Sequence, residues 1–115
     1  MTGQIDRHPL APWAGLFLGA AAWIGHQQSA AGAIFWDCRL GGPLLTGGLG
    51  LLFGLIAALG GAVSWRAHKA ASRAEDAPAH NRSVAGMIGA GAAGMFLLAI
   101  AFQSLTGFVV PACHR

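Results

Sequence analysis

The amino-acid sequence predicts an all-α membrane protein whose three transmembrane helices form an up-down-up bundle. Three apolar runs carry this prediction: Leu10–Trp36, Leu44–Trp65 and Val84–Val110. Each reaches the roughly 20 residues that a helix needs to cross the hydrocarbon core of a bilayer. The charged residues all lie outside these runs, and the 18 glycines among 115 residues suit closely packed membrane helices better than a small water-soluble core.

The segments between the runs define the expected elements of a single domain, residues 1–115. Pro12 suits the first turn of a helix, where its missing N–H costs little, so the first span is expected at about 10–36. The short connection that follows makes the second span, at about 44–65, its antiparallel neighbour. The polar residues 66–83 are expected to continue the second helix for a turn or two and then to loosen into a cytoplasmic loop before the third span, at about 84–110.

The basic residues predict the orientation, because the cytoplasmic flanks of membrane helices are enriched in Lys and Arg. The N-terminal segment and the polar loop hold Arg7, Arg66, Lys69, Arg73 and Arg82, whereas the opposite side holds Arg39 and Arg115. We therefore expect a multi-pass protein of the bacterial inner membrane, with a cytoplasmic N-terminus and a periplasmic C-terminus. The net charge of +3 is explained by this topology, and no nucleic acid partner is expected.

A competing interpretation concerns the first run, whose Ala31-Gly32-Ala33 imitates a signal-peptide cleavage site. Cleavage there would remove residues 1–33 and leave two spans. The apolar run continues past this site, which favours an uncleaved helix.

Two cysteines follow the first and third runs, so parity places Cys38 and Cys113 on the same side of the membrane in either orientation. In an oxidising compartment the pair is expected to form a disulfide between the outer ends of those helices. The alternative is a Cu(I) site with His114, since thiolate and imidazole are soft ligands. No CxxC motif or methionine cluster accompanies it.

A stripe of small residues runs along the second span at spacings of three and four. Its members are Gly47, Gly50, Gly54, Ala57, Gly61 and Ser64. Small side chains let membrane helices approach closely. The stripe therefore predicts a helix-packing face, either inside the bundle, which we favour, or toward another protein.

Three polar residues, His26, Gln27 and Gln103, are expected at membrane depth in the outer half of the first and third spans. They could hydrogen-bond across these two helices and fix their register. Alternatively, His26 could be an axial ligand of haem b, which requires an open face and usually a second ligand. A third interpretation has His26 contact a quinone or relay protons.

A family resemblance rests on the positions of eight residues: Pro12, Trp23, His26, Gln27, Cys38, Gln103, Pro111 and Cys113. The chain resembles small three-span membrane proteins encoded beside haem-copper terminal oxidases in proteobacteria. In that group a Trp–His pair on the first helix and one cysteine after each of the first and third helices recur. The resemblance implies a non-catalytic accessory or assembly subunit of a respiratory membrane complex.

The expected partners are therefore membrane lipid and subunits of a larger membrane complex, or further copies of the chain. No acidic residue lies within a span, and the sequence has no phosphate loop or HExxH motif, so catalysis by the isolated chain is not expected. The alternative function is a haem- or quinone-binding electron-transfer protein that uses His26.

Overall fold

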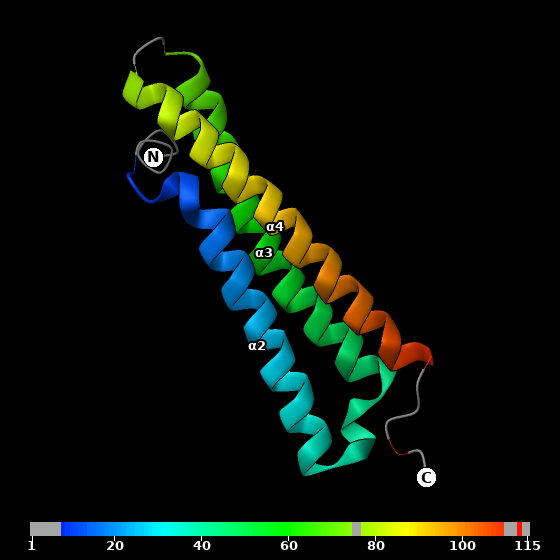
Figure 1. The fold of residues 1–115 in the computed structure, drawn as a ribbon. Helices are drawn as coiled ribbons and strands as arrows, with labels where there is room; N and C mark the ends of the chain where they lie inside the picture. The colour runs from blue at the N-terminus through cyan, green and yellow to red at the C-terminus, as the bar shows by residue number, and fades with distance from the viewer. Residues whose placement is uncertain (1–7, 75–76, 110–112, 114–115) are drawn as a thin grey trace.

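Three long helices lie side by side in the computed structural model, which describes residues 8–74, 77–109 and 113 (Figure 1). They are α2 (Ala14–Trp36), α3 (Pro43–Ser72) and α4 (Ala77–Val109). Two short 3-10 turns, η1 (Ala11–Trp13) and η2 (Cys38–Gly41), precede α2 and α3. The described residues contain no strand, so the all-α prediction is confirmed for this part of the chain.

Local sequence explains where the helices begin and end. η1 contains Pro12, and α3 starts with Pro43, so both prolines occupy a first turn that needs no N–H donor. α2 ends at Asp37, which adopts an extended conformation and accepts a hydrogen bond from the Arg39 N–H at 3.0 Å. This turn reverses the chain into α3.

The expected continuation of the second helix into residues 66–83 is confirmed for about two turns, whereas the second half of this segment is helical instead of loosened. α3 continues through Ser72 and α4 begins at Ala77. Alanine has the highest helix propensity, and Ala67 and Ala71 are also buried, so the helix continues beyond its apolar run. The end of the second apolar run and the start of the third mark a change in polarity, but α3 and α4 both extend past those points into residues 66–83.

Two of the helices are long and apolar enough to cross a membrane: α3 and residues Pro78–Val109 of α4. α2 has 23 residues, yet it carries the polar sequence His26-Gln27-Gln28-Ser29 near its middle. That sequence lowers the mean hydropathy of α2, so α2 is not among the helices that are apolar enough to cross a membrane by composition alone.

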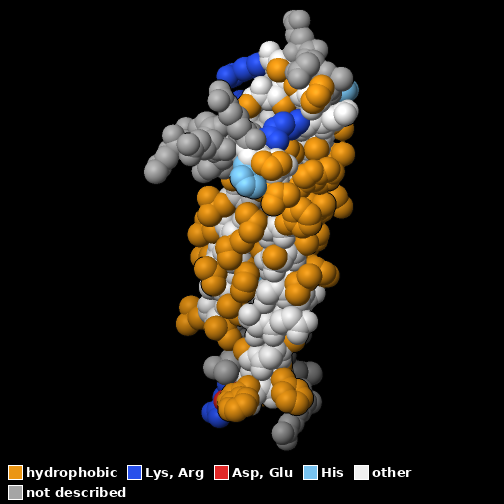
Figure 2. Space-filling view, turned by 90° about the vertical axis from the view of Figure 1, so that its left-hand side faces the viewer, with side chains coloured by type: hydrophobic (Ala, Val, Ile, Leu, Met, Phe, Trp, Pro, Cys, Tyr) orange, Lys and Arg blue, Asp and Glu red, His pale blue; other side chains and the backbone are white. Residues whose placement is uncertain are grey.

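Small residues fill the inside of the bundle and large apolar residues cover the outside. The core contains Ala22, Ala57 and Ile100, all at most 2% exposed. By contrast, Leu51 is 73% exposed and Phe102 is 67% exposed. Figure 2 shows hydrophobic side chains over most of the length of the visible face. This arrangement is typical of helices whose outer surface faces lipid.

The helices alternate in direction. α3 runs antiparallel to α4, since Gly50 lies against Ser104 and Gly61 against Ala93. α2 runs parallel to α4 and antiparallel to α3 (Figure 1). The bundle is a narrow rod with principal extents of 61 × 22 × 16 Å.

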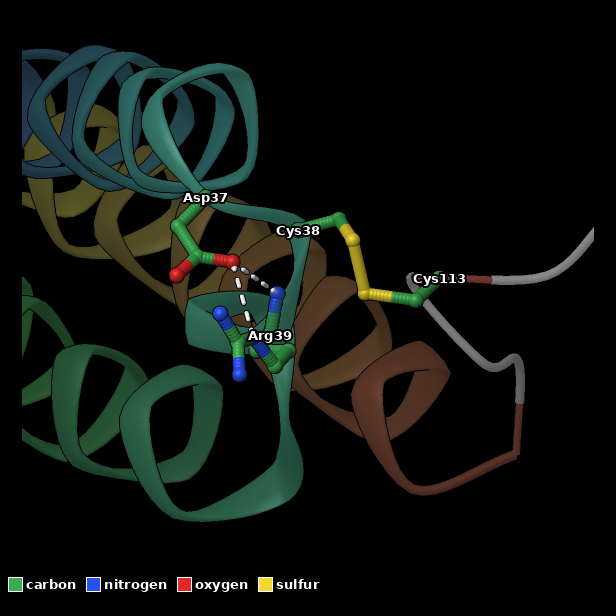
Figure 3. Close-up of polar contacts among 4 residues, drawn as sticks. All are labelled: Asp37, Cys38, Arg39 and Cys113. Carbon is green, nitrogen blue, oxygen red and sulfur yellow. Dashed lines mark hydrogen bonds and ion pairs between the residues drawn. A yellow bond between two sulfur atoms is a disulfide. The ribbon is translucent and has the colours of Figure 1, made fainter.

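A disulfide joins Cys38 of η2 to Cys113, with 5.2 Å between the Cα atoms (Figure 3). The two cysteines that the sequence places on one side of a membrane are therefore covalently linked. Beside the disulfide, the Arg39 Nε lies 3.4 Å from the Asp37 Oδ1. The bond links the turn after α2 to the segment after α4.

Candidate functional site

A buried histidine joins α2 to α4. His26 is 1% exposed, and its Nε2 lies 3.3 Å from the Oγ of Ser104. The Ser104 hydroxyl donates its hydrogen to the carbonyl of Ile100 at 2.8 Å. Because a serine has one hydrogen to donate, this arrangement makes the His26 Nε2–H the donor to Ser104. The Nδ1 is then an acceptor, and it has no hydrogen-bond partner.

Two further polar atoms near this level are buried without a partner: the Nε1 of Trp23 and the Oε1 of Gln103. Trp23 packs its ring against Phe96 of α4, with 6.1 Å between ring centroids. The ring of His26 meets Phe53 of α3 edge-on at 6.2 Å. Aromatic side chains of α3 and α4 therefore pack against both His26 and Trp23.

The polar contacts differ from those expected between His26, Gln27 and Gln103. The partner of His26 on α4 is Ser104, one residue farther along the chain. Gln27 is only partly buried. One residue turns a helix by about 100°, so neighbouring positions face different directions. The sequence identifies the depth of these residues but does not determine which of them meet.

An apolar groove of 550 Å³ lies between α3 and α4, next to the histidine. Its lining consists of Gly47, Gly50, Leu51, Gly54, Leu55, Ala58, Leu97, Ile100, Ala101, Ser104 and Phe108. Ser104 contributes the one polar side chain of this lining, and the same hydroxyl contacts His26. The groove and the buried histidine are thus connected through a single side chain.

The predicted small-residue stripe divides between the groove and the interior. Gly47, Gly50 and Gly54 line the groove, and a Cβ on Gly50 would collide with the Ser104 side chain. Ala57 is fully buried, and a Cβ on Gly61 would lie 2.9 Å from the Cβ of Ala93. The stripe therefore holds α3 against α4 and also shapes an outward-facing groove.

Ser64, the last residue of the small-residue stripe, makes a buried contact whose partners the sequence does not identify. Its side chain is fully buried, accepts a hydrogen bond from the Gly15 N–H at 2.7 Å and donates to the Pro12 carbonyl at 3.0 Å. It thereby satisfies a donor at the start of α2 that the helix itself cannot. The signal was a single hydroxyl at the end of a small-residue stripe.

Haem does not fit His26 in this arrangement. An axial ligand must present a ring nitrogen to an open face, whereas Nε2 contacts Ser104 and the ring is enclosed by three helices. Copper does not fit the cysteines either, because the disulfide removes both thiolates. His114 lies outside the described residues. The apolar groove suits a quinone, but its one polar lining side chain, Ser104, already donates its hydrogen to the Ile100 carbonyl and would have to leave it to bond a quinone oxygen.

The described residues contain no group of three His, Cys, Asp or Glu side chains that could hold a metal ion. Comparison with protein-family models, with curated proteins and with solved structures gives no significant match, so the site is interpreted from its own geometry.

Proposed function

We propose that the protein is a non-catalytic accessory or assembly subunit of a respiratory membrane complex, associated with a terminal oxidase. The groove between α3 and α4 carries the docking part of this proposal, because it offers glycines and one hydroxyl to a partner helix. Lipid chains are as apolar as leucine, so membrane helices associate through close backbone approach and polar contacts. The oxidase part of the proposal rests on the family resemblance.

In this proposal all three helices cross the bacterial inner membrane, with the N-terminus in the cytoplasm and Cys113 in the periplasm. The exposed large apolar residues on each helix support it, including Phe17 on α2, Leu55 on α3 and Met95 on α4. The disulfide also supports it, because periplasmic proteins retain disulfides that the cytoplasm would reduce.

The deciding experiment is affinity purification of the tagged protein in a mild detergent, with mass spectrometry and an absorption spectrum on the same sample. The proposal expects subunits of a terminal oxidase, identified by mass, together with the haem absorption of that oxidase. A purified protein that repeatedly lacks oxidase subunits contradicts it.

The groove can be tested in the same assay with matched glycine substitutions on α3. In the double variant Gly47→Ala and Gly54→Ala, the new methyl groups lie 3.4 Å or more from the nearest side-chain atoms, so the bundle itself tolerates them. They occupy space in the groove, and recovery of the oxidase should fall several-fold. Gly48→Ala is the control, since nothing lies within 4 Å of its Cβ position. Equal recovery from both variants would exclude the groove as the docking face.

The second candidate is a haem- or quinone-binding membrane electron-transfer protein. The quinone form is favoured by the apolar groove beside Ser104, whose hydroxyl contacts His26 on its other side. The haem form requires the contact between His26 and Ser104 to open. Extraction of quinone from the purified wild-type protein, lost in Ser104→Ala, would support this candidate. A colourless and quinone-free preparation argues against it.

A further inference from the structure

We propose that an exposed basic face at the end of α3 binds the phosphate groups of anionic phospholipids. The basic face consists of Arg66, Lys69 and Arg73, all of which are exposed. The inference rests on the chain lying in a bilayer and is independent of any respiratory partner.

Helical spacing directs these three cations to one side. Residues three and four apart are neighbours on a helix surface, so the three side chains share one face. The opposite face of the same turns holds Ala67, which is fully buried, and Ala71, which is 6% exposed. Because this small-residue face packs inside the bundle, the cations point away from the other helices. Figure 2 shows Lys and Arg at the ends of the bundle, beyond the hydrophobic surface.

Trp65 fixes the depth of the basic face. Its indole is 46% exposed, and tryptophan prefers the headgroup level of a bilayer. The ring packs against His68 at 5.0 Å between centroids, and the His68 Nδ1 lies 2.9 Å from the Ser83 Oγ of α4. From Arg66 to Arg73 the helix rises about 10 Å, similar to the headgroup layer outside the hydrocarbon core.

The sequence of this end of the chain carries a net positive charge. Residues 66–83 hold Arg66, Lys69, Arg73 and Arg82 against Glu75 and Asp76, both of which lie outside the described residues. Each Lys or Arg near an anionic membrane surface strengthens binding about fivefold. Three cations aligned at phosphate depth should therefore select anionic headgroups over zwitterionic ones.

The experiment measures which lipids remain bound when the protein is released from mixed micelles for native mass spectrometry. The probes are phosphatidylglycerol and phosphatidylcholine of equal chain length at equal concentration. We expect phosphatidylglycerol to be enriched at least about tenfold on the wild-type protein, and the enrichment should fall as salt is raised.

The variant Arg66→Gln, Lys69→Gln and Arg73→Gln should bind the two lipids equally. Arg66→Lys with Arg73→Lys keeps the charge and should keep the enrichment. Arg39→Gln is the matched control, since it removes one exposed cation from the other end of the bundle. Unchanged helicity and thermal stability verify that each variant is folded.

Three results would overturn the proposal. The first is equal retention of both lipids by the wild-type protein, which would mean that the basic face binds a different anionic partner, such as an acidic protein segment. The second is enrichment that survives the triple Gln substitution. The third is an equal loss in Arg39→Gln, which would assign the preference to net charge alone.

Discussion

Two serines, Ser64 fully buried and Ser104 partly buried, connect the helices near opposite ends of the bundle, and each relies on a neighbouring glycine. Ser64 of α3 bonds the backbone at the start of α2, where Gly15 and Gly89 let the chains approach. Ser104 of α4 bonds His26, where Gly50 leaves space for the hydroxyl. Each of these polar contacts between helices therefore needs a serine on one helix and a glycine opposite it, because a larger side chain at the glycine position would keep the helices apart.

Ser64→Ala should lower the free energy of unfolding by about 1–3 kcal/mol, because the Gly15 N–H and the Pro12 carbonyl would both lose a buried partner. Denaturant unfolding in micelles, followed by circular dichroism, measures the change. Ser72→Ala is the control on the same helix, since Ser72 is exposed and its hydroxyl donates to the Lys69 carbonyl three residues earlier in α3. Equal effects of the two substitutions would rule out a special role for Ser64.

Gly89→Ala should destabilise the fold, because the new Cβ would overlap the Pro12 carbonyl and lie 2.6 Å from the Ser64 Oγ. We expect a loss of about 1–3 kcal/mol from this overpacking. Gly91→Ala, two residues away with nothing within 4 Å, should be neutral or stabilise by up to about 1 kcal/mol through helix propensity. Thermal unfolding of both variants tests the contrast, and a stable Gly89→Ala protein would contradict the close approach.

At the scale of elements, α2 and α4 run parallel and are covalently linked at one end through η2 and Cys113. The bridge closes a separation of 75 residues that contains both α3 and α4. Loop-closure entropy then gives a maximum stabilisation of about 4 kcal/mol for a fully unfolded reference chain. Helices that persist in micelles restrict that reference chain and reduce the effect.

Reductant should therefore lower the midpoint of thermal unfolding of the wild-type protein. It should leave the double variant Cys38→Ser and Cys113→Ser unchanged. Mass spectrometry after alkylation checks the bond directly, and we expect neither thiol to be labelled until reductant is added. Complete labelling of both cysteines without reductant would show that the bridge is absent.

The sequence predicted the helices more accurately than their contacts. Apolar runs identify helices because hydropathy is a local property, but the helical end of α3 depends on Ala67 and Ala71 packing into the bundle. Parity predicted only that Cys38 and Cys113 lie on the same side, and the expected disulfide between them is confirmed. The pairing of His26 with Ser104 rather than Gln103 depends on the rotation of α4 about its axis. That rotation is set by tertiary packing of small residues, which no single helix encodes.

At the scale of the whole molecule, the bundle places small residues inside and large apolar ones outside. Phe35 and Leu44 are each 93% exposed, beside the turn that joins α2 to α3. Such a surface would aggregate in water, since monomeric soluble proteins rarely expose large apolar patches. A lipid environment removes that penalty for all three helices at once.

The proposed orientation predicts opposite labelling of the two ends. In a background of Cys38→Ser and Cys113→Ser, Arg39→Cys should react with a membrane-impermeant maleimide in spheroplasts. Arg73→Cys should react only after lysis, because two spans separate it from the cytoplasmic N-terminus and return it to the cytoplasmic side. The reverse pattern would invert the topology, and labelling of both without lysis would contradict spanning helices.

The link between Cys38 and Cys113 also orders events in time. The second sulfur follows α4, so the bond cannot close until the last helix has been synthesised and has packed beside α2. Oxidation of this pair thus marks the moment at which assembly of the three helices is complete. In a pulse-chase experiment the oxidised species should arise from full-length chains only, and a chain arrested before α4 would keep a reactive Cys38 thiol.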